Sequence, residues 1–529
     1  MIKSLLLAVS VISHEPGYYT SLAKHTQRWL GDQNISARLA TPETMDAALG
    51  RSSIAFLVGF SEPTEAEMRS LRKFRSRGGK LVVFYSASPE LGALMGVKPL
   101  GYAKASYPGQ WSRMDFSSSF PAGVPKSVLQ TSTVLQRAVP LPGKGRVMAT
   151  WSDRNGRSTG DAAWISTAGG FWMTHVLLAD GDEKLKSQLL AAIVGSVKPS
   201  AWNVRAYRER ESVAAASTKA FALAQRPRAG EIRAVWDHSG CGLYPGDWPR
   251  TMKILQASRV TDLFVNVAGA GFAHYPSSVL PRSATYQREG DQLAACLAAA
   301  KGTGIRVHAW MLCFTGTRSS PDRMKIFRQR GWLLKTREGK VSEYLDPSSP
   351  AVRKLVLDGM SELVSKYPVH GIHLDFVRWY ERSVKPPNAA DVISSFVSEA
   401  RMRVRKPKWL TTAVLGKYPT CIASVGQDWM GWVRSGSVDY VVPMNYSDDR
   451  ARFESFVAQQ GSVNAYARRV ICGIGVTANE SRLDARQVIE QMNIARRHGL
   501  AGTALFDLDT TLEKDILPYL RMGIWSWKK

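Results

Sequence analysis

The chain has 529 residues, too many for a single hydrophobic core, so we expect two or three domains. Hydrophobic residues make up 44% and charged residues 22%, as in ordinary globular proteins. Lys and Arg number 70 against 44 Asp and Glu, a formal net charge of +26 with local excesses at 318–340 and 401–408. Such a charge favours polyanionic partners. No nucleic-acid-binding module is recognisable, so we do not expect DNA or RNA to be that partner.

Cysteine usage argues against a disulfide scaffold and against a zinc site. The count is odd, the spacings are wide and no CxxC pair occurs. The cysteines all lie in the second half of the chain, at Cys241, Cys296, Cys313, Cys421 and Cys472. No His, Asp and Glu residues have convincing metal-ligand spacing either, so we predict no metal and no cofactor.

The first residues allow two interpretations. Met1-Ile-Lys3 followed by Ser4–Ser13 fits the charged and apolar regions of a signal peptide, and it equally fits a first strand. The apolar part is short and no small-residue cleavage site follows, which favours the strand. We nevertheless expect an exported protein. No other segment approaches the roughly 20 apolar residues needed to span a membrane.

Residues 1–200 alternate between strand and helix patterns. Strands are predicted at Leu5–Ile12, Ile54–Phe60, Lys80–Tyr85 and Phe171–Leu178, and helices at Tyr18–Leu30, Thr64–Arg77 and Glu183–Val197. This alternation predicts a doubly wound α/β domain.

The strand Leu81-Val-Val-Phe-Tyr85 and the turn Ser86-Ala-Ser-Pro-Glu-Leu91 resemble the flavodoxin-like domains related to class I glutamine amidotransferases, which include accessory domains of some glycosidases. Amidotransferase chemistry needs a cysteine nucleophile at that turn, and residues 1–200 contain no cysteine. Ser86 and Ser88 lack an evident base. We therefore expect a structural or binding role for this domain.

Residues 201–230 read as a partly helical linker, and residues 231–529 then repeat one pattern eight times. Strands are predicted at Ile232–Asp237, Asp262–Val267, Ile305–Leu312, Gly371–Asp375, Leu410–Leu415, Val438–Tyr446, Val470–Val476 and Thr503–Asp507, with helical patterns between them. Eight β–α pairs in about 300 residues predict a (β/α)8 TIM barrel.

Polar and aromatic residues gather where these strands end. In Gly371–Asp375 the side chains alternate, so His373 and Asp375 share one face. Active sites of such barrels lie at the carboxyl ends of the strands. The candidate residues there are Trp236, Asp237, Asn266, His308, Trp310, Asp375, Arg378, Trp379, Asn445, Tyr446 and Asp507.

Two segments carry a family resemblance. Tyr344-Leu-Asp-Pro-Ser-Ser-Pro-Ala-Val-Arg353 followed by Val369-His-Gly-Ile-His-Leu-Asp375 resembles the glycosyl hydrolase-like family 10 proteins, bacterial TIM-barrel glycosidases of which some act on cell-wall glycan. The resemblance extends from about Glu231 to Tyr519. It implies a glycoside hydrolase with a polysaccharide substrate. A common form of the motif has two adjacent acids; Phe376 stands at the second, so only the role of Asp375 carries over.

Glycoside cleavage generally needs two carboxyl groups, one as proton donor and one as nucleophile or base. Asp375 is the first candidate, and Asp507 or Asp237 the second. Arg378 should lower the pKa of Asp375 and hold it ionised. Substrate contacts are expected from Arg378, Tyr446, Asn445, Asn266, His308, Trp310, Trp236 and Trp379, each of which could instead serve only the fold.

Two other functions stay open. One is a barrel that binds glycan without cleaving it, since the second carboxylate is unproven. The other is a basic nucleic-acid-binding or scaffold protein. The net charge of +26 leads us to expect an anionic or envelope-associated glycan as substrate. The sugar, the linkage, the stereochemical outcome and the oligomeric state are not specified by the sequence.

Overall fold

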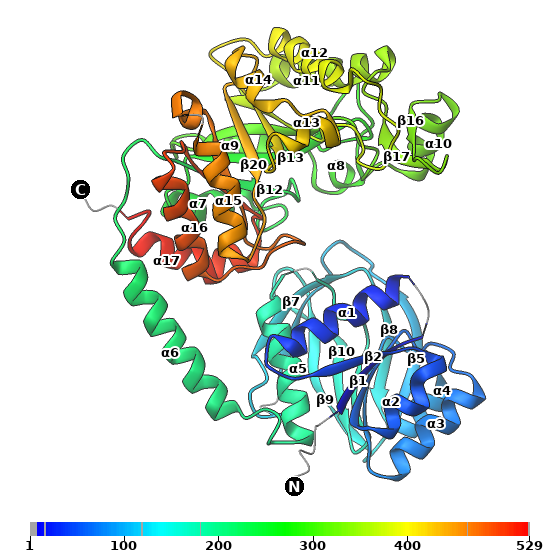
Figure 1. Ribbon diagram of the computed structural model, residues 1–529. Coiled ribbons are helices and arrows are strands. Elements are labelled where there is room, and N and C mark those ends of the chain that lie inside the picture. Colours follow the sequence, from blue (N-terminus) through cyan, green and yellow to red (C-terminus); the bar gives the residue numbers. More distant parts are fainter. Residues whose placement is uncertain (1–7, 15–16, 118–119, 180, 463, 527–529) are drawn as a thin grey trace. The chain divides into compact units, whose positions relative to one another are not determined.

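The computed structural model describes residues 8–14, 17–117, 120–179, 181–462 and 464–526 (Figure 1). The chain divides into two compact units, Met1–Ala215 and Ala216–Lys529. The division falls inside helix α6 (Val204–Leu223), within the predicted linker. Strand β1 (Ala8–Ser13) covers the end of the first predicted strand, whereas residues 1–7 of the signal-peptide alternative lie outside the described residues.

The N-terminal unit contains a nine-stranded sheet in the order β2-β1-β3-β4-β11-β10-β9-β6-β7. The first five strands in this order are parallel, and the remaining pairings are antiparallel. The strands not yet given are β2 (Ala37–Ala40), β3 (Ser52–Val58), β4 (Lys80–Phe84), β6 (Trp111–Phe116), β7 (Ser127–Ser132), β9 (Gly145–Ser152), β10 (Ser158–Thr167) and β11 (Gly170–Met173). A separate pair is formed by β5 (Val97–Lys104) and β8 (Val134–Pro140).

Helices cover both faces of this sheet, which confirms the predicted doubly wound arrangement. Helices α1 (Tyr18–Gly31) and α5 (Glu183–Val197) pack in one hydrophobic cluster. Helices α2 (Met45–Gly50), α3 (Glu65–Ser76) and α4 (Pro89–Met95) pack in another cluster. Strand residues alternate between the two clusters, because successive side chains of a strand point to opposite faces.

The antiparallel strands were not predicted. Polar residues and Gly interrupt or flank their apolar residues, as in β5 (VKPLGYAK), β7 (SVLQTS) and the first half of β10 (STGD). The two serines of the predicted turn have structural bonds. Ser86 Oγ donates to the Phe60 carbonyl at 2.5 Å, and Ser88 Oγ accepts from the Leu91 N–H at 3.1 Å as the N-cap of α4.

The C-terminal unit is a closed barrel of eight parallel strands, as predicted. The order is β12-β22-β21-β20-β19-β18-β15-β13, and β12 also pairs with β13 to close the ring. The strands are β12 (Ile232–Asp237), β13 (Asp262–Gly269), β15 (Arg306–Leu312), β18 (Gly371–Asp375), β19 (Trp409–Leu415), β20 (Tyr440–Met444), β21 (Ile471–Gly475) and β22 (Gly502–Phe506).

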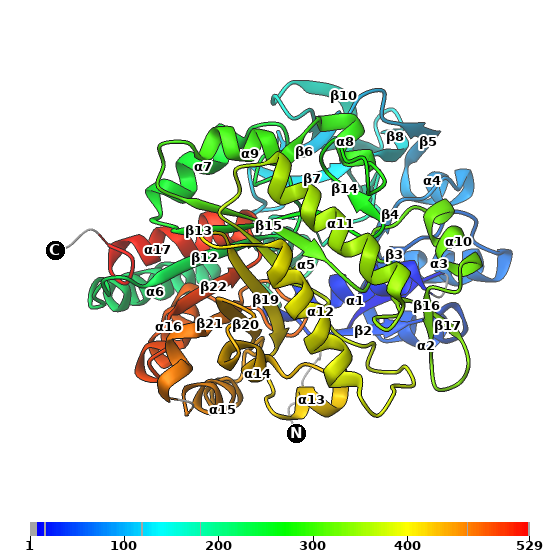
Figure 2. The same ribbon diagram turned by 90° about the horizontal axis from the view of Figure 1, so that it is seen from above.

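Helices surround these strands (Figure 2). They are α7 (Trp248–Ala257), α9 (Gln292–Ala300), α11 (Pro350–Lys366), α12 (Ala389–Arg403), α14 (Trp429–Arg434), α15 (Arg450–Gly461), α16 (Ala485–Arg497) and α17 (Leu517–Met522). Further elements that the sequence did not predict are β14 (Phe272–Ala273), α8 (Ala284–Glu289), α10 (Pro321–Gln329), β16 (Leu333–Lys335), β17 (Val341–Leu345) and α13 (Thr420–Val425).

The inside of the barrel is filled with side chains in layers. At the strand starts, Asp262 is fully buried and lies 2.8 Å from both His308 Nε2 and Arg306 Nε. One layer further along, the Trp236 indole N–H donates to His373 Nε2 at 2.9 Å. An indole can only donate, so His373 Nε2 must be an acceptor and this histidine is neutral. Burial accordingly lowers the pKa of His373.

We predict that Asp262→Asn destabilises the barrel. Burial alone would raise the pKa of Asp262, but hydrogen bonds from His308 and Arg306 outweigh it and hold the pKa below its ordinary value. A carboxylate of this kind contributes stability above its unfolded pKa of about 3.9, and the contribution is lost as the pH falls further. We expect the free energy of unfolding in urea to fall by about 3 kcal/mol at pH 7 and by less at pH 2. An equal loss at both pH values would contradict this account.

Candidate active site

The carboxyl ends of the barrel strands bring together a compact set of the predicted residues. Asp375 ends β18, and its carbonyl accepts from the Cys313 N–H at 2.8 Å just beyond β15. Asn266 and Trp310 are register partners on neighbouring strands β13 and β15. Tyr446 and Asp507 follow β20 and β22. The parallel direction of all eight strands places these residues at one end of the barrel.

Asp375 is 5% exposed, and its carboxylate is held by local groups. Its Oδ1 accepts from the Phe376 N–H at 2.6 Å and lies 3.8 Å from Arg378 Nη1. Burial raises the pKa of Asp375, and the Arg378 charge, the Phe376 N–H and the Trp310 indole offset the rise only in part. The sequence-based expectation of a lowered pKa is therefore wrong. Arg378 acts in the predicted direction, but desolvation is the larger effect.

Aromatic rings surround Arg378. Its guanidinium lies 4.3 Å from the centre of the Phe376 ring, and Tyr344 and Tyr380 stack face to face at 4.2 Å beside it. Arg378 Nη1 is buried and has no hydrogen-bond partner within the part of the chain that the structure describes. Tyr344 comes from β17, in the excursion between β15 and α11. Tyr344 lies in the segment that carries the family resemblance, but it was not predicted to lie at the site.

Asp507 is the second carboxyl group at this end. Its Oδ1 accepts from the backbone N–H groups of His238 at 3.0 Å and Leu508 at 2.6 Å. The side chain is partly exposed, yet protein surrounds it closely enough that burial raises its pKa well above the ordinary value. The charges of Asp237 and Asp509 add to that rise, whereas the hydrogen bonds from His238 and Leu508 oppose it.

Tyr446 connects the two carboxyl groups electrostatically. Its ring stacks on Phe506 at 5.4 Å and meets Trp236 edge-on at 6.4 Å. Burial raises the pKa of Tyr446, and the charges of Asp375 and Asp507 raise it further. Strand β20 lies two strands from β18 and two strands from β22 in the barrel order, so Tyr446 follows a strand between those that carry Asp375 and Asp507.

Asp237 has a different environment, although it also ends a strand. It is fully buried and accepts from Ser239 Oγ at 2.6 Å, the Gly240 N–H at 3.1 Å and the Gly242 N–H at 2.9 Å. These three donors come from its own following loop. These bonds hold the loop after β12, and burial raises the pKa of Asp237. A catalytic role for Asp237 stays a prediction.

Two predicted contact residues lie deeper in the barrel than expected. His308 is the third residue of β15 and sits at the strand starts with Asp262, at the end opposite Asp375. Trp236 is 1% exposed and packs inside the barrel against Phe264. The alternation of side chains along each strand correctly predicted that both residues face inward, but it does not indicate how far along the barrel axis they lie. Neither residue can provide an exposed surface for a substrate.

Trp379 and Asn445 point outward from the barrel. Trp379 is 2% exposed within the core between strands and helices, and its indole donates to the Ala389 carbonyl at 3.0 Å. Asn445 is fully buried and exchanges two hydrogen bonds with Gln460 of α15, at 3.0 and 2.7 Å. Both were predicted as substrate contacts, and both instead fix helices to strands.

Asn266 keeps a buried polar atom unsatisfied at this end of the barrel. Among the described residues, Asn266 Oδ1 has no hydrogen-bond partner, whereas the Trp310 indole acts on Asp375. Asn266 Nδ2 donates to the His238 carbonyl at 3.3 Å, which fixes the direction of the amide. Buried polar atoms are normally paired, so the Asn266 oxygen is available to a bound molecule.

Arg318 and His238 were not among the predicted site residues, although His238 directly follows the predicted strand Ile232–Asp237. Arg318 Nη1 donates to the His238 carbonyl at 2.9 Å, and its guanidinium lies 4.9 Å from the centre of the Phe272 ring. Burial and the Arg318 charge lower the pKa of His238 to about 4, so its imidazole is neutral at pH 7. The only signal for Arg318 in the sequence was the basic excess that begins at that residue.

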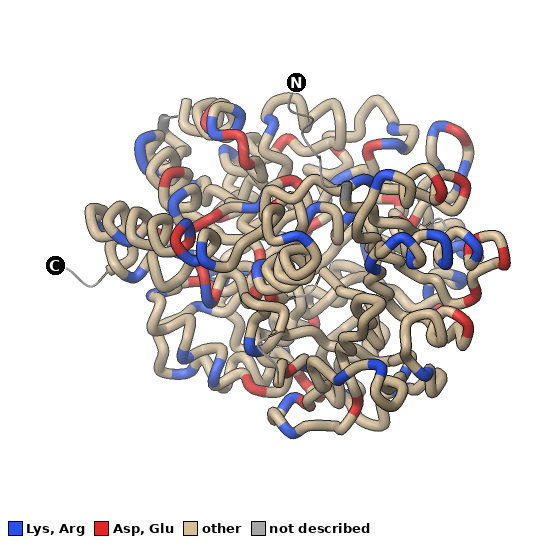
Figure 3. The backbone as a smooth tube through the Cα atoms, turned by 90° about the horizontal axis from the view of Figure 1, so that it is seen from below, with Lys and Arg blue, Asp and Glu red and all other residues tan. Residues whose placement is uncertain are grey.

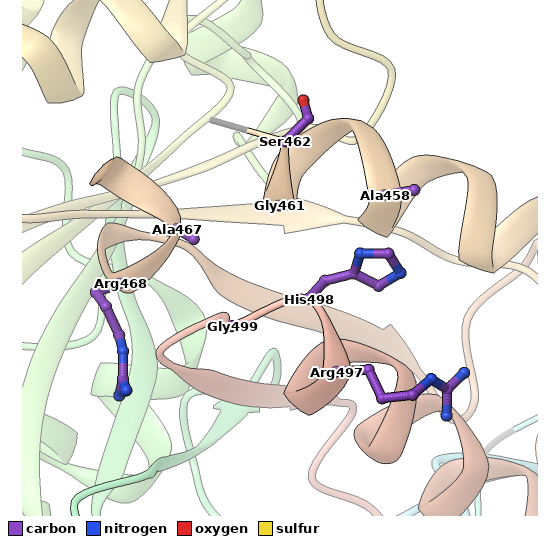
Figure 4. A pocket seen from close by; sticks show the side chains of 8 residues that line it. All are labelled: Ala458, Gly461, Ser462, Ala467, Arg468, Arg497, His498 and Gly499. Carbon is purple, nitrogen blue, oxygen red and sulfur yellow. The ribbon is translucent and has the colours of Figure 1, made fainter. Parts of the chain in front are cut away.

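A surface hollow of about 550 Å³ lies elsewhere in this unit, where α15 and α16 end (Figure 4). Arg468 lies on one side of it, and Arg497 and His498 lie on the other. Helices of the barrel end near the strand starts, so this hollow is remote from Asp375.

Over the described residues, no group of three or more His, Cys, Asp or Glu side chains could hold a metal ion. No described helix is long and apolar enough to cross a membrane.

We predict that Arg378→Gln raises the pKa of Asp375 further. An opposite charge at this distance typically lowers a carboxyl pKa by about one unit, and its removal leaves burial unopposed. The carboxyl ¹³C chemical shift of Asp375, followed against pH, measures the change. Arg382→Gln is the matched control, because Arg382 is exposed in the same loop and is not among the groups that shift Asp375. A pKa that stays unchanged in Arg378→Gln would show that the ion pair has no influence.

The chain was compared with known proteins. The model of the family described as "Glycosyl hydrolase-like 10" matches residues 231–391, which contain strands β12 to β18. No curated protein sequence matches the chain.

Several solved structures are similar. The α-L-fucosidase isoenzyme 2 from Paenibacillus thiaminolyticus is 15% identical over 55% of this chain and 48% of its own, with a TM-score of 0.40. The chain thus spans about half the length of that fucosidase. Catalytic domain 2 of the Ostrinia furnacalis group II chitinase is 11% identical over 55% of this chain and 94% of its own, with a TM-score of 0.39. A ThuA-like protein from Bacteroides uniformis is 15% identical over 37% of this chain and 93% of its own, with a TM-score of 0.30.

The family match agrees with the resemblance carried by the segment that ends at Asp375. Residues 231–391 match the model of that family, and they include the segment that ends at Asp375.

Proposed function

We propose that the barrel is a glycoside hydrolase that cleaves a polysaccharide with Asp375 and Asp507 as its two carboxyl groups. The observation that carries the proposal is that both groups have raised pKa values, lie at the carboxyl end of the barrel and influence the same tyrosine, Tyr446. The glycosyl hydrolase-like 10 match over residues 231–391 supports the reaction class.

The two carboxyl groups differ in a way that assigns their roles. Asp375 has the Arg378 cation 3.8 Å away, whereas the largest charge effects on Asp507 come from the carboxylates of Asp237 and Asp509, which raise its pKa. Asp507 therefore holds its proton to higher pH. A proton donor needs a raised pKa, and its partner must ionise first. We assign Asp507 as the proton donor to the leaving oxygen and Asp375 as the nucleophile or base.

The surroundings suit a sugar substrate. Asn266 offers an unpaired carbonyl oxygen, which can accept a hydrogen bond from a sugar hydroxyl group. Tyr344 and Tyr380 are partly exposed and present a stacked aromatic surface beside Arg378. Aromatic rings with a polar edge bind molecules that have both apolar faces and hydroxyl groups.

One observation favours a second candidate, a barrel that binds glycan without cleaving it. Phe376 occupies the position at which a common form of the family motif has a second acid. Its backbone is left-handed, with φ of 52°, and its ring supports Arg378 instead of offering a carboxylate. Loss of that acid is consistent with a site that has kept its sugar contacts and lost its turnover.

Asp375→Asn is the decisive variant. We expect the release of reducing ends from a panel of polysaccharides to fall by about 100- to 10,000-fold, because an essential carboxyl group is removed without loss of packing. Asp262→Asn is the matched control. It also alters a buried carboxyl group of the barrel, but at the strand starts, and Asp262 is not among the groups that shift the pKa of Asp375 or Asp507. We expect it to lower the melting temperature while the folded fraction keeps its activity.

A folded Asp375→Asn protein with nearly full activity would refute the assignment. Binding of polysaccharide without release of reducing ends by the wild-type chain would favour the second candidate.

We further propose that the substrate carries negative charge. The net charge is +26, and Lys and Arg are dispersed along the backbone (Figure 3). Two cations, Arg378 and Arg318, lie at the carboxyl end of the barrel. Attraction over this range is screened by salt, with a Debye length of about 10 Å at 0.1 M ionic strength and about 3 Å at 1 M.

Raising the salt concentration from 0.05 to 1 M should therefore weaken binding of polygalacturonate at least about tenfold while binding of an uncharged glucan of equal length stays constant. Affinities that are equal for both polymers and independent of salt would exclude a charged substrate.

A further inference from the structure

A second group of aromatic residues lies in the N-terminal unit, at the carboxyl end of its parallel strands. Tyr18 and Tyr19 begin the helix after β1, Tyr85 follows β4 directly, and His175 comes two residues after β11. In open α/β sheets, ligands bind outside the carboxyl ends of the strands. The group therefore occupies the part of the sheet where a ligand is expected.

The rings are fixed by close contacts. Tyr18 and Tyr19 meet edge-on at 5.6 Å, and Tyr85 meets His175 edge-on at 5.5 Å. A Cβ atom at Gly59, just beyond β3, would lie 2.6 Å from the Tyr19 ring, so only glycine lets this ring approach the strand end. Tyr85 itself has a left-handed backbone with φ of 54°. Such strained residues persist where the surrounding structure enforces them, often at binding sites.

Tyr102 joins the group from a separate strand pair. It is the register partner of Gln136 on β8, and the Gln136 N–H donates to the Thr174 carbonyl at 2.9 Å, next to His175. Burial raises the pKa of Tyr85, and Tyr19, Tyr102 and Tyr18 raise it further, in keeping with their closeness. Gln136 Oε1 is buried and has no hydrogen-bond partner among the described residues. It is an acceptor that a bound hydroxyl group could satisfy.

We call Tyr18, Tyr19, Tyr85, Tyr102, Gln136 and His175 the tyrosine cluster. Tyr18 and Tyr102 are each 61% exposed, whereas most large aromatic side chains of this unit are buried. Exposed tyrosines offer flat apolar faces and hydroxyl groups together, which matches the alternating CH faces and hydroxyl groups of a sugar chain. The cluster includes no Lys or Arg to hold a phosphate, which argues against nucleic acid.

We propose that the tyrosine cluster is a saccharide-binding site, separate from the carboxylates of the barrel. It binds a sugar chain by stacking on Tyr18 and Tyr102, with Gln136 Oε1 accepting a hydrogen bond from a hydroxyl group. It holds no group needed for cleavage, so its contribution is affinity for a glycan and not turnover.

The test is binding of the full-length chain to an array of plant, fungal and bacterial oligosaccharides, in an Asp375→Asn background that prevents cleavage. Tyr18→Ala with Tyr102→Ala should weaken binding to at least one glycan by about tenfold or more. Tyr18→Trp with Tyr102→Trp should preserve it, since the stacking faces remain. Tyr107→Ala is the matched control, an exposed tyrosine of the same unit (47%) outside the cluster.

Binding that is unchanged in the double alanine variant, that is lost equally in Tyr107→Ala or in the tryptophan variant, or that is absent for every glycan, would overturn the proposal. Hydrolysis is measured separately on short soluble oligosaccharides with Asp375 intact, and the alanine variant should retain it. Array binding that depends on the tyrosines, without any hydrolysis by the intact chain, would leave this inference standing and reject the proposed activity.

Discussion

Closure of the barrel is the constraint on which the candidate site depends. Strand β12 pairs with β13 on one side and with β22 on the other, and the second pairing brings Gly502 against Ile232. A Cβ atom at Gly502 would lie 2.0 Å from the Ile232 carbonyl oxygen, so a side chain there would push the two strands apart. Closure fixes the eight strand ends in a ring, and only then do Asp375 and Asp507 come to influence one tyrosine.

The two ends of the barrel use buried carboxylates in opposite ways. At the strand starts, Asp262 is bonded to a histidine and an arginine, and its charge is fully matched. At the strand ends, the hydrogen bonds to Asp375 and Asp507 do not offset the free-energy cost of burying a carboxylate, so the pKa values of both groups are raised. The paired carboxylate at the strand starts stabilises the fold, whereas the carboxyl groups at the strand ends can bind and release protons closer to neutral pH.

Much of the fold was predictable because continuous apolar runs mark buried parallel strands, as in Ile54–Val58 of β3, and because alternation marks strands such as Gly371–Asp375. The antiparallel strands of the N-terminal unit were missed, since polar residues interrupt or flank their apolar residues, as in β7 and β10. Asp375 and Arg378 were correctly brought together, because both lie within four residues on one strand end. His308 was misplaced because alternation identifies the face of a strand but not the depth along it.

The remaining misses depend on long-range geometry. The stacking of Tyr344 on Tyr380 joins β17 to the loop after β18, and nothing local in either segment indicates that contact. The sign of the Asp375 shift required the extent of its burial, which no spacing in the sequence reveals.

The left-handed backbone at Phe376 bears on how this sequence can diverge. Asp and Asn tolerate φ near +52° better than a bulky aromatic residue does, so the main chain at this position is already shaped for a short polar side chain. An exchange of Phe for Asp would relieve local strain while removing the ring beneath Arg378. A chain with two adjacent acids at this motif could therefore keep the same backbone and differ from the present chain by one substitution. The Arg378 guanidinium would then lose its contact with the Phe376 ring and lie beside two carboxylates.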